Sequence, residues 1–388
     1  MIKLLAKLFI KDYDNYSDPA VRTQYGVLAG IVGIVMNFLL FAGKLAAGLI
    51  SSSVSVVADA FNNLSDAGSA VISIAGYHIA AMPADKEHPF GHGRAEYVAG
   101  LIVSCSIIFM ALEIGKESFS KIFAPDELSA GTAAFIVLGA SILVKLYIFF
   151  YNRRIGRLIN SAPMKAVAID SLSDCISTLS AIAALVVYAV WNVNIDGYIG
   201  LLITVIILKA GIEAAKESLA PLLGEKADDS YIEGIRETAN SFSGIIGVHD
   251  LHVHNYGVGR NVVSLHAEIP AEMSFIEAHE IADALENELS AKYGALVTVH
   301  MDPSADDNER SAEYKALIAE LLKEVSPEAT MHDFRMTERD SGTVLVFDIE
   351  VPFGLALGDD EIKARIADGL RARYPSVSAI ICVDKKIY

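Results

Sequence analysis

Six apolar stretches, each about as long as a membrane-spanning helix, fill most of the first 216 residues of this 388-residue chain. A transmembrane helix needs about 20 mostly apolar residues, and a helix that is apolar all round must lie in a protein core or in lipid. The mean hydropathy of the chain is +0.41. We therefore expect a polytopic α-helical membrane domain in a lipid bilayer, with six transmembrane helices near residues 27–50, 54–81, 96–118, 131–151, 165–191 and 196–216.

The charge is divided unevenly along the chain. Residues 1–223 carry 16 Lys+Arg and 17 Asp+Glu, a net charge of −1, whereas residues 224–388 carry 15 and 31, a net charge of −16. A nucleic-acid-binding protein needs a basic face, so the acidic half argues against that class of partner. The three cysteines, Cys105, Cys175 and Cys382, form no CxxC pair and predict neither a disulfide framework nor a thiolate metal cluster.

Basic residues predict how the membrane half is oriented. They precede the first stretch and fill the connections between stretches two and three and between four and five. The positive-inside rule then places both termini and the acidic half in the cytoplasm. The first stretch begins too late for a cleaved signal peptide, and we expect a multi-pass protein of a bacterial or archaeal cytoplasmic membrane. The basic residues are Lys3, Lys7, Lys11, Arg22, Lys86, Arg94, Arg153, Arg154 and Arg157.

Polar residues with helical spacing interrupt two of the apolar stretches. Asn62 and Asp66 are four apart in the second stretch, and Asp170 and Asp174 are four apart in the fifth. Residues four apart share a helix face, so two such faces can form a pocket of three carboxylates and one amide oxygen. Carboxylates do not stay charged in hydrocarbon without a cation or protons. The pattern favours a divalent metal site that exchanges its ion with protons, and a structural hydrogen-bonded network is the alternative.

Five further charged residues lie in the same stretches. Asp59 is seven residues before Asp66 and so lies on a similar face, where it is a fifth ligand, a vestibule charge or a structural contact. The other four are expected toward helix ends, or with side chains that reach the membrane surface: Lys44, Glu113, Lys145 and Lys209.

Three motifs give the chain its resemblance to the cation diffusion facilitator family. They are DAFNNLSD from Asp59 to Asp66, PADKEHPFGHGRAE from Pro83 to Glu96, and DSLSD from Asp170 to Asp174. The resemblance extends to about residue 302. It implies a six-helix membrane domain, a cytoplasmic metallochaperone-like α/β domain, a homodimer, and export of divalent metals from the cytoplasm in exchange for protons.

The resemblance also implies roles for individual residues. The transport site of the family falls on Asn62, Asp66, Asp170 and Asp174. Zinc-transporting members commonly have histidine where this chain has Asp170. Imidazole suits zinc, whereas carboxylate and carbonyl oxygens suit manganese and magnesium. The combination resembles the manganese-exporting branch, so we expect Mn²⁺ efflux, with Fe²⁺, Co²⁺ or Zn²⁺ as alternative substrates.

A second site of the family falls on Asp85, His88 and His92, in the connection after the second stretch. Two histidines four residues apart with a nearby carboxylate have plausible metal-ligand spacing. The alternative is that Pro89, Gly91 and Gly93 build a tight turn that the histidines cap.

The acidic half reads as two similar domains. Residues 228–302 read helix, strand, strand, helix, strand, with strands at 246–256, 260–269 and 295–301 and a helix at 274–289. Residues 248–251, 267–270, 281–285 and 300–302 are similar to residues 331–334, 349–352, 366–370 and 382–384, at offsets of 82 to 85 residues. We expect tandem α+β (ferredoxin-like) cytoplasmic domains at 224–303 and 308–388, joined by the linker Pro303–Asn308 and preceded by the membrane domain at 1–223.

The ligands of the family's cytoplasmic metal site have a complete set of matching residues in the first copy only. In the second copy Ala364 stands where His279 would align, and we expect a degenerate copy with a structural or regulatory role. The matching residues of the first copy are His249, His266, His279, His300 and Asp302, and those of the second copy are His332, Asp348, Cys382 and Asp384.

The expected mechanism is a cycle in which metal enters from the cytoplasm, the helices rearrange, and protons release the ion on the other side. The competing class is a non-transporting membrane metal sensor or scaffold. An enzyme is disfavoured, because the sequence has no nucleophile elbow, HExxH motif or phosphate-binding loop.

Overall fold

The computed structural model describes residues 2–386, except residues 17, 51–53, 124–131, 192, 194, 305–308 and 340–341. By their internal contacts the residues divide into two compact units. Unit 1 consists of Met1–Glu225 with Tyr256–Gly259, and unit 2 consists of Lys226–Asn255 with Arg260–Tyr388. Most of the predicted linker, residues 305–308, lies outside the described residues.

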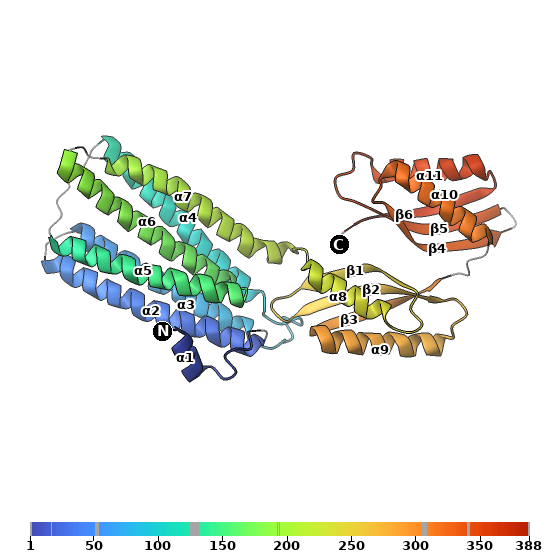
Figure 1. Cartoon of the computed structure of the whole chain (residues 1–388), viewed down its shortest axis with the longest axis horizontal. Helices are drawn as coiled ribbons and strands as arrows, with labels where there is room; N and C mark the ends of the chain where they lie inside the picture. Colours follow the sequence, from blue (N-terminus) through green and yellow to red (C-terminus); the bar gives the residue numbers. More distant parts are fainter. Residues whose placement is uncertain are drawn as a thin grey trace. The chain divides into compact units, whose positions relative to one another are not determined.

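Unit 1 is a bundle of helices that run side by side (Figure 1). A short helix α1 (Ile2–Phe9), which the sequence analysis did not predict, precedes the long helices of the described part. Each long helix coincides with one of the predicted apolar stretches. They are α2 (Pro19–Ile50), α3 (Val54–Ala80), α4 (Ala95–Phe123), α5 (Thr132–Leu158), α6 (Ala162–Trp191) and α7 (Asp196–Leu223).

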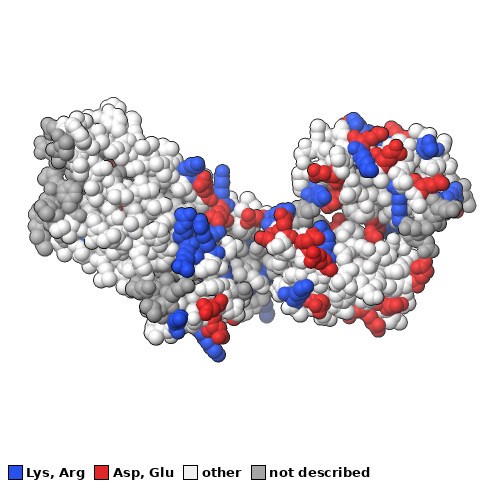
Figure 2. Space-filling model, viewed as in Figure 1, with Lys and Arg blue, Asp and Glu red and all other residues white. Residues whose placement is uncertain are grey.

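Four of these helices contain segments that are long and apolar enough to cross a membrane. The segments are Pro19–Ala46, Ala95–Phe123, Ile136–Leu158 and Gly197–Leu223, in α2, α4, α5 and α7. Helices α3 and α6, which carry the predicted carboxylates, are not among the four found in the described residues. Figure 2 shows that the visible face of the bundle is nearly bare of charge except at one end, whereas unit 2 carries charges of both signs.

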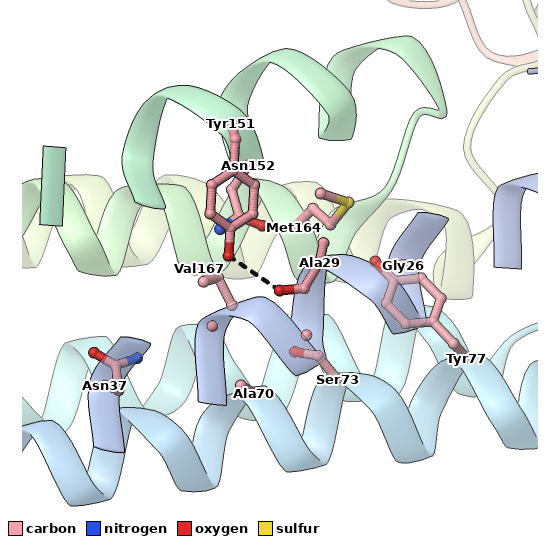
Figure 3. A pocket seen from close by; sticks show the side chains of 12 residues that line it. Gly26, Ala29, Asn37, Ala70, Ser73, Tyr77, Tyr151, Asn152, Met164 and Val167 are labelled. Atoms are coloured by element: carbon pink, nitrogen blue, oxygen red, sulfur yellow. Dashed lines mark hydrogen bonds between the residues drawn. The ribbon is translucent and has the colours of Figure 1, made fainter. Parts of the chain in front are cut away.

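Small residues allow the helices of unit 1 to approach one another closely. A Cβ atom added at Gly30 of α2 would lie 2.5 Å from the Ile74 side chain of α3, and one at Gly26 would meet the Tyr77 ring at the same distance. A small cavity remains among α2, α3, α5 and α6 (Figure 3). At its edge the Tyr151 hydroxyl donates a hydrogen bond of 3.0 Å to the Ala29 carbonyl, which ties α5 to α2.

A buried ion pair joins three parts of the bundle. The guanidinium of Arg22 in α2 donates two hydrogen bonds, of 2.6 and 2.8 Å, to the carboxylate of Glu96 in α4. The same guanidinium donates to the carbonyls of Ile159 and Asn160 between α5 and α6. Arg22 is therefore a structural residue as well as one of the basic residues that set the predicted orientation.

Unit 2 begins with a helix–strand–strand–helix–strand segment, as the sequence predicts for residues 228–302. Strands β1 and β2 pair antiparallel, β2 and β3 pair parallel, and the order in the sheet is β1-β2-β3. Ser274 caps the second helix by accepting a hydrogen bond from the Glu277 amide, and Gly294 ends that helix in a left-handed conformation. The elements are α8 (Asp229–Asn240), β1 (Gly247–Asn255), β2 (Asn261–Pro270), α9 (Phe275–Tyr293) and β3 (Ala295–Ser304).

The rest of unit 2 has the same order of elements. Strands β4 and β5 pair antiparallel, and β5 and β6 pair parallel. A ferredoxin-like βαββαβ fold has a strand before its first helix, and the described residues of each copy show three strands without it. The elements are α10 (Glu309–Val325), β4 (Thr330–Arg339), β5 (Gly342–Val351), α11 (Asp359–Arg373) and β6 (Val377–Lys385).

Candidate metal centres

Three carboxylates from two helices meet inside unit 1. Asp66 lies on α3, and Asp170 and Asp174 lie one turn apart on α6. One oxygen of each lies within 4.8 Å of an oxygen of the other two. Asp66 and Asp170 are 5% and 6% exposed. The spacing of four residues thus places Asp170 and Asp174 on one face of α6 that points at α3.

Asn62 lies beside this cluster, one turn before Asp66. Its amide nitrogen donates a hydrogen bond of 3.4 Å to an Asp174 oxygen, so its side chain bridges α3 and α6. Asp59 also lies on α3, in a stretch whose side chains lie outside the described part of the structure. The structure therefore brings together Asn62, Asp66, Asp170 and Asp174.

Lys145 occupies the middle of the carboxylate cluster. The prediction that this lysine lies toward a helix end or reaches the membrane surface is wrong. Its ammonium nitrogen lies 2.6 Å from an oxygen of Asp66 and 2.6 Å from an oxygen of Asp174, and its side chain is 3% exposed. Lys145 sits near the midpoint of α5, which packs against α6, and its side chain reaches Asp66 of α3.

A cavity of about 130 Å³ adjoins the cluster and is lined by Asn62, Lys145 and Asp174. Two of its other polar residues, Ser177 and Thr178, follow Asp174 along α6, so it extends from the carboxylates toward the carboxyl end of α6. The volume is large enough to hold water.

Lys44 of α2 also lines this cavity and is 3% exposed, so the expectation that its side chain reaches the membrane surface is wrong as well.

The connection between α3 and α4 holds the second predicted group together. One Asp85 oxygen accepts hydrogen bonds from the backbone amides of Glu87 and His88, at 2.9 and 2.6 Å. The amide of His88, followed by that of Glu87, holds the pKa of Asp85 below its usual value. The other Asp85 oxygen lies 3.3 Å from His92 Nε2, while His92 Nδ1 lies 3.1 Å from the Pro83 carbonyl.

This arrangement fits both readings of the loop. A histidine whose Nδ1 hydrogen donates to a carbonyl presents Nε2 as a metal ligand. The ligand atoms of Asp85, His88 and His92 lie within 4.8 Å of one another. Gly91 has φ +80°, a left-handed conformation typical of a tight turn.

A third group lies on the sheet of the first cytoplasmic copy. His266 Nδ1 lies 2.8 Å from an Asp302 oxygen, and His249 Nε2 lies 3.4 Å from the same oxygen. The parallel register that pairs His266 with His300 and Glu268 with Asp302 places these side chains side by side. His300 Nε2 lies 3.3 Å from the other Asp302 oxygen. Burial, together with the neighbouring His332, lowers the pKa of His249.

His279 is not part of this group within one chain. It lies on α9 with its side chain 66% exposed, and its described carboxylate contact is with Asp283 on the same helix at 3.8 Å. The structure thus brings together His249, His266, His300 and Asp302 and leaves His279 apart.

The second copy assembles a group at the equivalent positions. His332, Asp348 and Asp384 have ligand atoms within 4.8 Å of one another. Cys382 is exposed, and its sulfur lies 3.9 Å from an Asp384 oxygen. Burial of the thiol and the Asp384 carboxylate raise the pKa of Cys382, which disfavours the thiolate that a metal needs.

Asp250 is a residue that the sequence analysis missed. Its carboxylate lies 3.3 Å from His332 Nε2, so the two copies touch at this point. The His332 imidazole lowers the pKa of Asp250. A sequence signal was present, because His-Asp occurs at the same place in both copies, at 249–250 and 332–333.

Comparison with known proteins places the chain in a family. Residues 30–223 match the model of the cation efflux transmembrane domain, and residues 227–304 match that of the cation efflux protein cytoplasmic domain. An uncharacterized transporter of Methanocaldococcus jannaschii is 30% identical over 261 residues, which cover 67% of this chain and 92% of that protein.

Two further relatives have names that describe efflux. The manganese efflux system protein MneS of Bacillus subtilis is 30% identical over 287 residues, which cover 72% of this chain and 96% of that protein. The cation-efflux pump FieF of Serratia proteamaculans is 27% identical over 287 residues, with 73% and 95% covered. The family match over half of the chain, and the buried carboxylates within it, show that the chain belongs to the cation diffusion facilitator family of divalent metal efflux transporters.

Proposed function

We propose that the protein exports Mn²⁺ from the cytoplasm in exchange for protons, through Asn62, Asp66, Asp170 and Asp174. The observation that carries the proposal is the buried cluster of three carboxylates around the Lys145 ammonium. Charged groups buried in a low-dielectric region are stable only when their charges are balanced. The ionised cluster is therefore stable only when cations or protons balance its charge.

The charge of the cluster fits a divalent ion. The three ionised carboxylates and the Lys145 ammonium, which contacts two of them, carry a net charge of −2, which one divalent metal ion balances. Lys44, which lines the adjoining cavity, is outside this count. Two protons balance the same charge when the metal leaves. The proposed cycle thus exchanges one metal ion for two protons and keeps the cluster close to neutral in both states.

The donor atoms support manganese over zinc. The candidate ligands are carboxylate and amide oxygens, the class of ligand that suits Mn²⁺, whereas imidazole nitrogen suits zinc. The similarity to the manganese efflux system protein MneS supports the same choice.

Lys145 competes with the metal for the same oxygens. Its ammonium contacts Asp66 and Asp174, so a metal ion that binds these carboxylates must shift the lysine side chain. When the metal leaves, the ammonium returns and closes the site. In this way the lysine prevents the metal-free cluster from holding uncompensated charge during the return step.

The surroundings of the cluster complete the proposal. Under the proposed orientation, with six spans and both termini in the cytoplasm of a cell membrane, the cavity beside Asp174 extends away from the cytoplasmic side. The match to the family's cytoplasmic domain supports a homodimer. The group around Asp85, and the group that His266 and His300 form with Asp302, bind metal without carrying it across the membrane.

Metal flux in sealed vesicles that contain the purified protein tests this function. Mn²⁺, Zn²⁺, Fe²⁺ and Co²⁺ are compared under an imposed pH gradient. We expect Mn²⁺ flux that is lost in Asp174→Ala and that stops when the proton gradient is collapsed. Glu113→Gln is the matched control, because it removes a carboxylate of α4 that lies outside the cluster. Asp170→His should shift the preference from Mn²⁺ toward Zn²⁺, because it introduces an imidazole ligand.

Other outcomes identify the competing functions. Zn²⁺, Fe²⁺ or Co²⁺ flux with little Mn²⁺ flux would keep the transporter and change the metal. Metal binding without flux of any ion would indicate a membrane metal sensor or scaffold. Mn²⁺ flux that persists without a proton gradient would contradict the antiport.

A further inference from the structure

The two cytoplasmic copies of unit 2 meet at equivalent irregularities of their sheets. The pairing of β1 with β2 shifts register between His249 and His252, and that of β4 with β5 shifts between His332 and Arg335. Asp250 and Asp333, inside these bulges, have φ +48° and +50°, a conformation that non-glycine residues rarely adopt. Bulges commonly re-aim a side chain at a functional site. Here the first bulge directs Asp250 to His332 of the other copy.

The contact brings a histidine of each copy to one carboxylate. The rings of His249 and His332 have centroids 4.6 Å apart, and the ligand atoms of His249, Asp250 and His332 lie within 4.8 Å of one another. Both histidine side chains are 11% exposed. Two nitrogens and one oxygen thus converge from two separately folded sheets.

The facing ring nitrogens lack ordinary partners. Nε2 of His249 and Nε2 of His332 are buried, and neither makes a hydrogen bond with any described residue. Each lies instead 3.4 or 3.3 Å from a carboxylate oxygen, of Asp302 and Asp250 respectively. Burying an imidazole nitrogen without a partner is unfavourable, so this arrangement calls for a further group.

The distances fit a metal ion as that group. Ligands at about 2.0–2.1 Å from a tetrahedral zinc ion are separated from one another by about 3.4 Å. That separation is longer than a good hydrogen bond. It is close to the 3.3 Å between His332 Nε2 and an Asp250 oxygen. A polar cavity of about 190 Å³, lined in part by Asp302, His332 and Asp333, lies beside the group and leaves room for a water ligand.

We propose that His249, Asp250 and His332 bind a zinc-like divalent cation that joins the second cytoplasmic copy to the first. Two imidazoles and one carboxylate leave one open position of a tetrahedral site, which suits zinc better than manganese. The metal has more ligands when the copies are docked than when they are apart. Cytoplasmic metal therefore shifts the copies toward the docked state, by its differential affinity for that state.

Zinc binding to the full-length protein in lipid nanodiscs tests the proposal, with hydrogen exchange of β4 as a second readout. Zn²⁺ should slow exchange in Thr330–Arg339 of the wild type. His332→Asn should remove one bound Zn²⁺ per chain, or weaken binding about tenfold or more, and abolish the slowing. His252→Asn is the matched control, because this histidine lies on the same strand as His249 and is exposed. It should behave as the wild type does.

Two carboxylate variants decide which copy holds the metal. Asp250→Asn should weaken zinc binding and abolish the Zn²⁺-dependent slowing of hydrogen exchange in β4. Asp348→Asn should leave zinc binding and this slowing unchanged. The opposite result would place the ion inside the second copy alone and overturn the proposal. Equal zinc stoichiometry and equal β4 exchange in the wild type and His332→Asn would also overturn it, and would leave a metal-free His332–Asp250 ion pair. Mn²⁺ flux is measured separately, so the proposed transport can fail without affecting this result.

Discussion

At the scale of single residues, Lys145 shows how a membrane lysine can be misread. A lone lysine in an apolar stretch is usually explained by a side chain that reaches the membrane surface. The face of the helix decides otherwise here, because Ser141, Lys145 and Asn152 of α5 are 2%, 3% and 3% exposed. They are four and seven residues apart and so form one buried polar stripe. This spacing was visible in the sequence and could have identified the lysine.

Removing the ammonium should change how the protein responds to metal. Lys145→Met leaves the carboxylates of Asp66 and Asp174 without their partner, and breaking a buried ion pair costs about 3–5 kcal/mol. We therefore expect a lower melting temperature for the metal-free variant. Mn²⁺ then supplies the missing charge without a competitor, so it should raise the melting temperature more in the variant than in the wild type. Thermal unfolding in detergent, with and without Mn²⁺, measures both effects.

The control for this prediction is Lys209→Met. Lys209 lies on α7 with its side chain 78% exposed, 3.9 Å from Glu213. Lys209 contacts no carboxylate of the cluster in any described interaction, so its loss should leave the Mn²⁺-dependent rise in melting temperature as it is in the wild type. A Mn²⁺-dependent rise that is equal in Lys145→Met and the wild type would show that lysine and metal do not compete.

At the scale of helices and strands, sequence patterns predicted which helices exist better than they predicted where each helix begins and ends. Apolar length predicted the first long helix near residue 27, but α2 begins at Pro19. Its polar first turns are set by a local signal, since the Asp18 side chain accepts a hydrogen bond of 2.7 Å from the Ala20 amide and Pro19 suits the first helical position. Hydropathy identifies the apolar part of a helix but not its polar cap, so it missed the first two turns of α2.

The carboxylate cluster could be predicted, and the contact between the copies could not. The i, i+4 pairs determine which face of α3 and of α6 is polar. Polar faces within a membrane are unfavourable against lipid, so the two faces are expected to lie against each other inside the bundle. The approach of Asp250 to His332 depends on two bulges and on the packing of two separate sheets. No spacing within either copy encodes that packing. His279 lies apart from the other predicted ligands within one chain for a related reason, because matching a ligand position says nothing about which surface that side chain faces.

The Arg22–Glu96 pair gives a prediction about how α2 and α4 hold together. Glu96→Gln removes the charge that compensates a buried guanidinium but keeps the shape of the side chain. We expect a loss of stability of about 3 kcal/mol, measured as a lower melting temperature in detergent. Glu117→Gln, on the same helix α4, is the control, because Glu117 is 68% exposed and pairs with Lys121 one turn away. Its loss should cost about 0.5 kcal/mol or less. Equal effects of the two substitutions would contradict a structural role for the buried pair.

At the scale of the whole molecule, the two units offer metals different ligands. The buried carboxylate group of unit 1 consists of oxygen ligands, whereas the groups of unit 2 that include His249 and His266 combine imidazole with carboxylate. Imidazole ligands suit zinc, whereas carboxylate and carbonyl oxygens suit manganese. One chain should therefore hold both metals at once, with Mn²⁺ at the buried carboxylates of unit 1 and Zn²⁺ at the histidine-containing groups of unit 2.

This division predicts separable losses after the metals are stripped with a chelator and added back together. Asp174→Ala should lose its bound Mn²⁺ and keep its Zn²⁺. Electron paramagnetic resonance spectroscopy measures the bound Mn²⁺. His266→Asn, which removes the imidazole 2.8 Å from Asp302, should lose the Zn²⁺ of the Asp302 group and keep its Mn²⁺. Loss of both metals in either variant would mean that the units share one pool of sites. Retention of the unaffected metal in each variant would mean that a zinc signal in the cytoplasm can act on unit 2 without occupying the path of the exported ion.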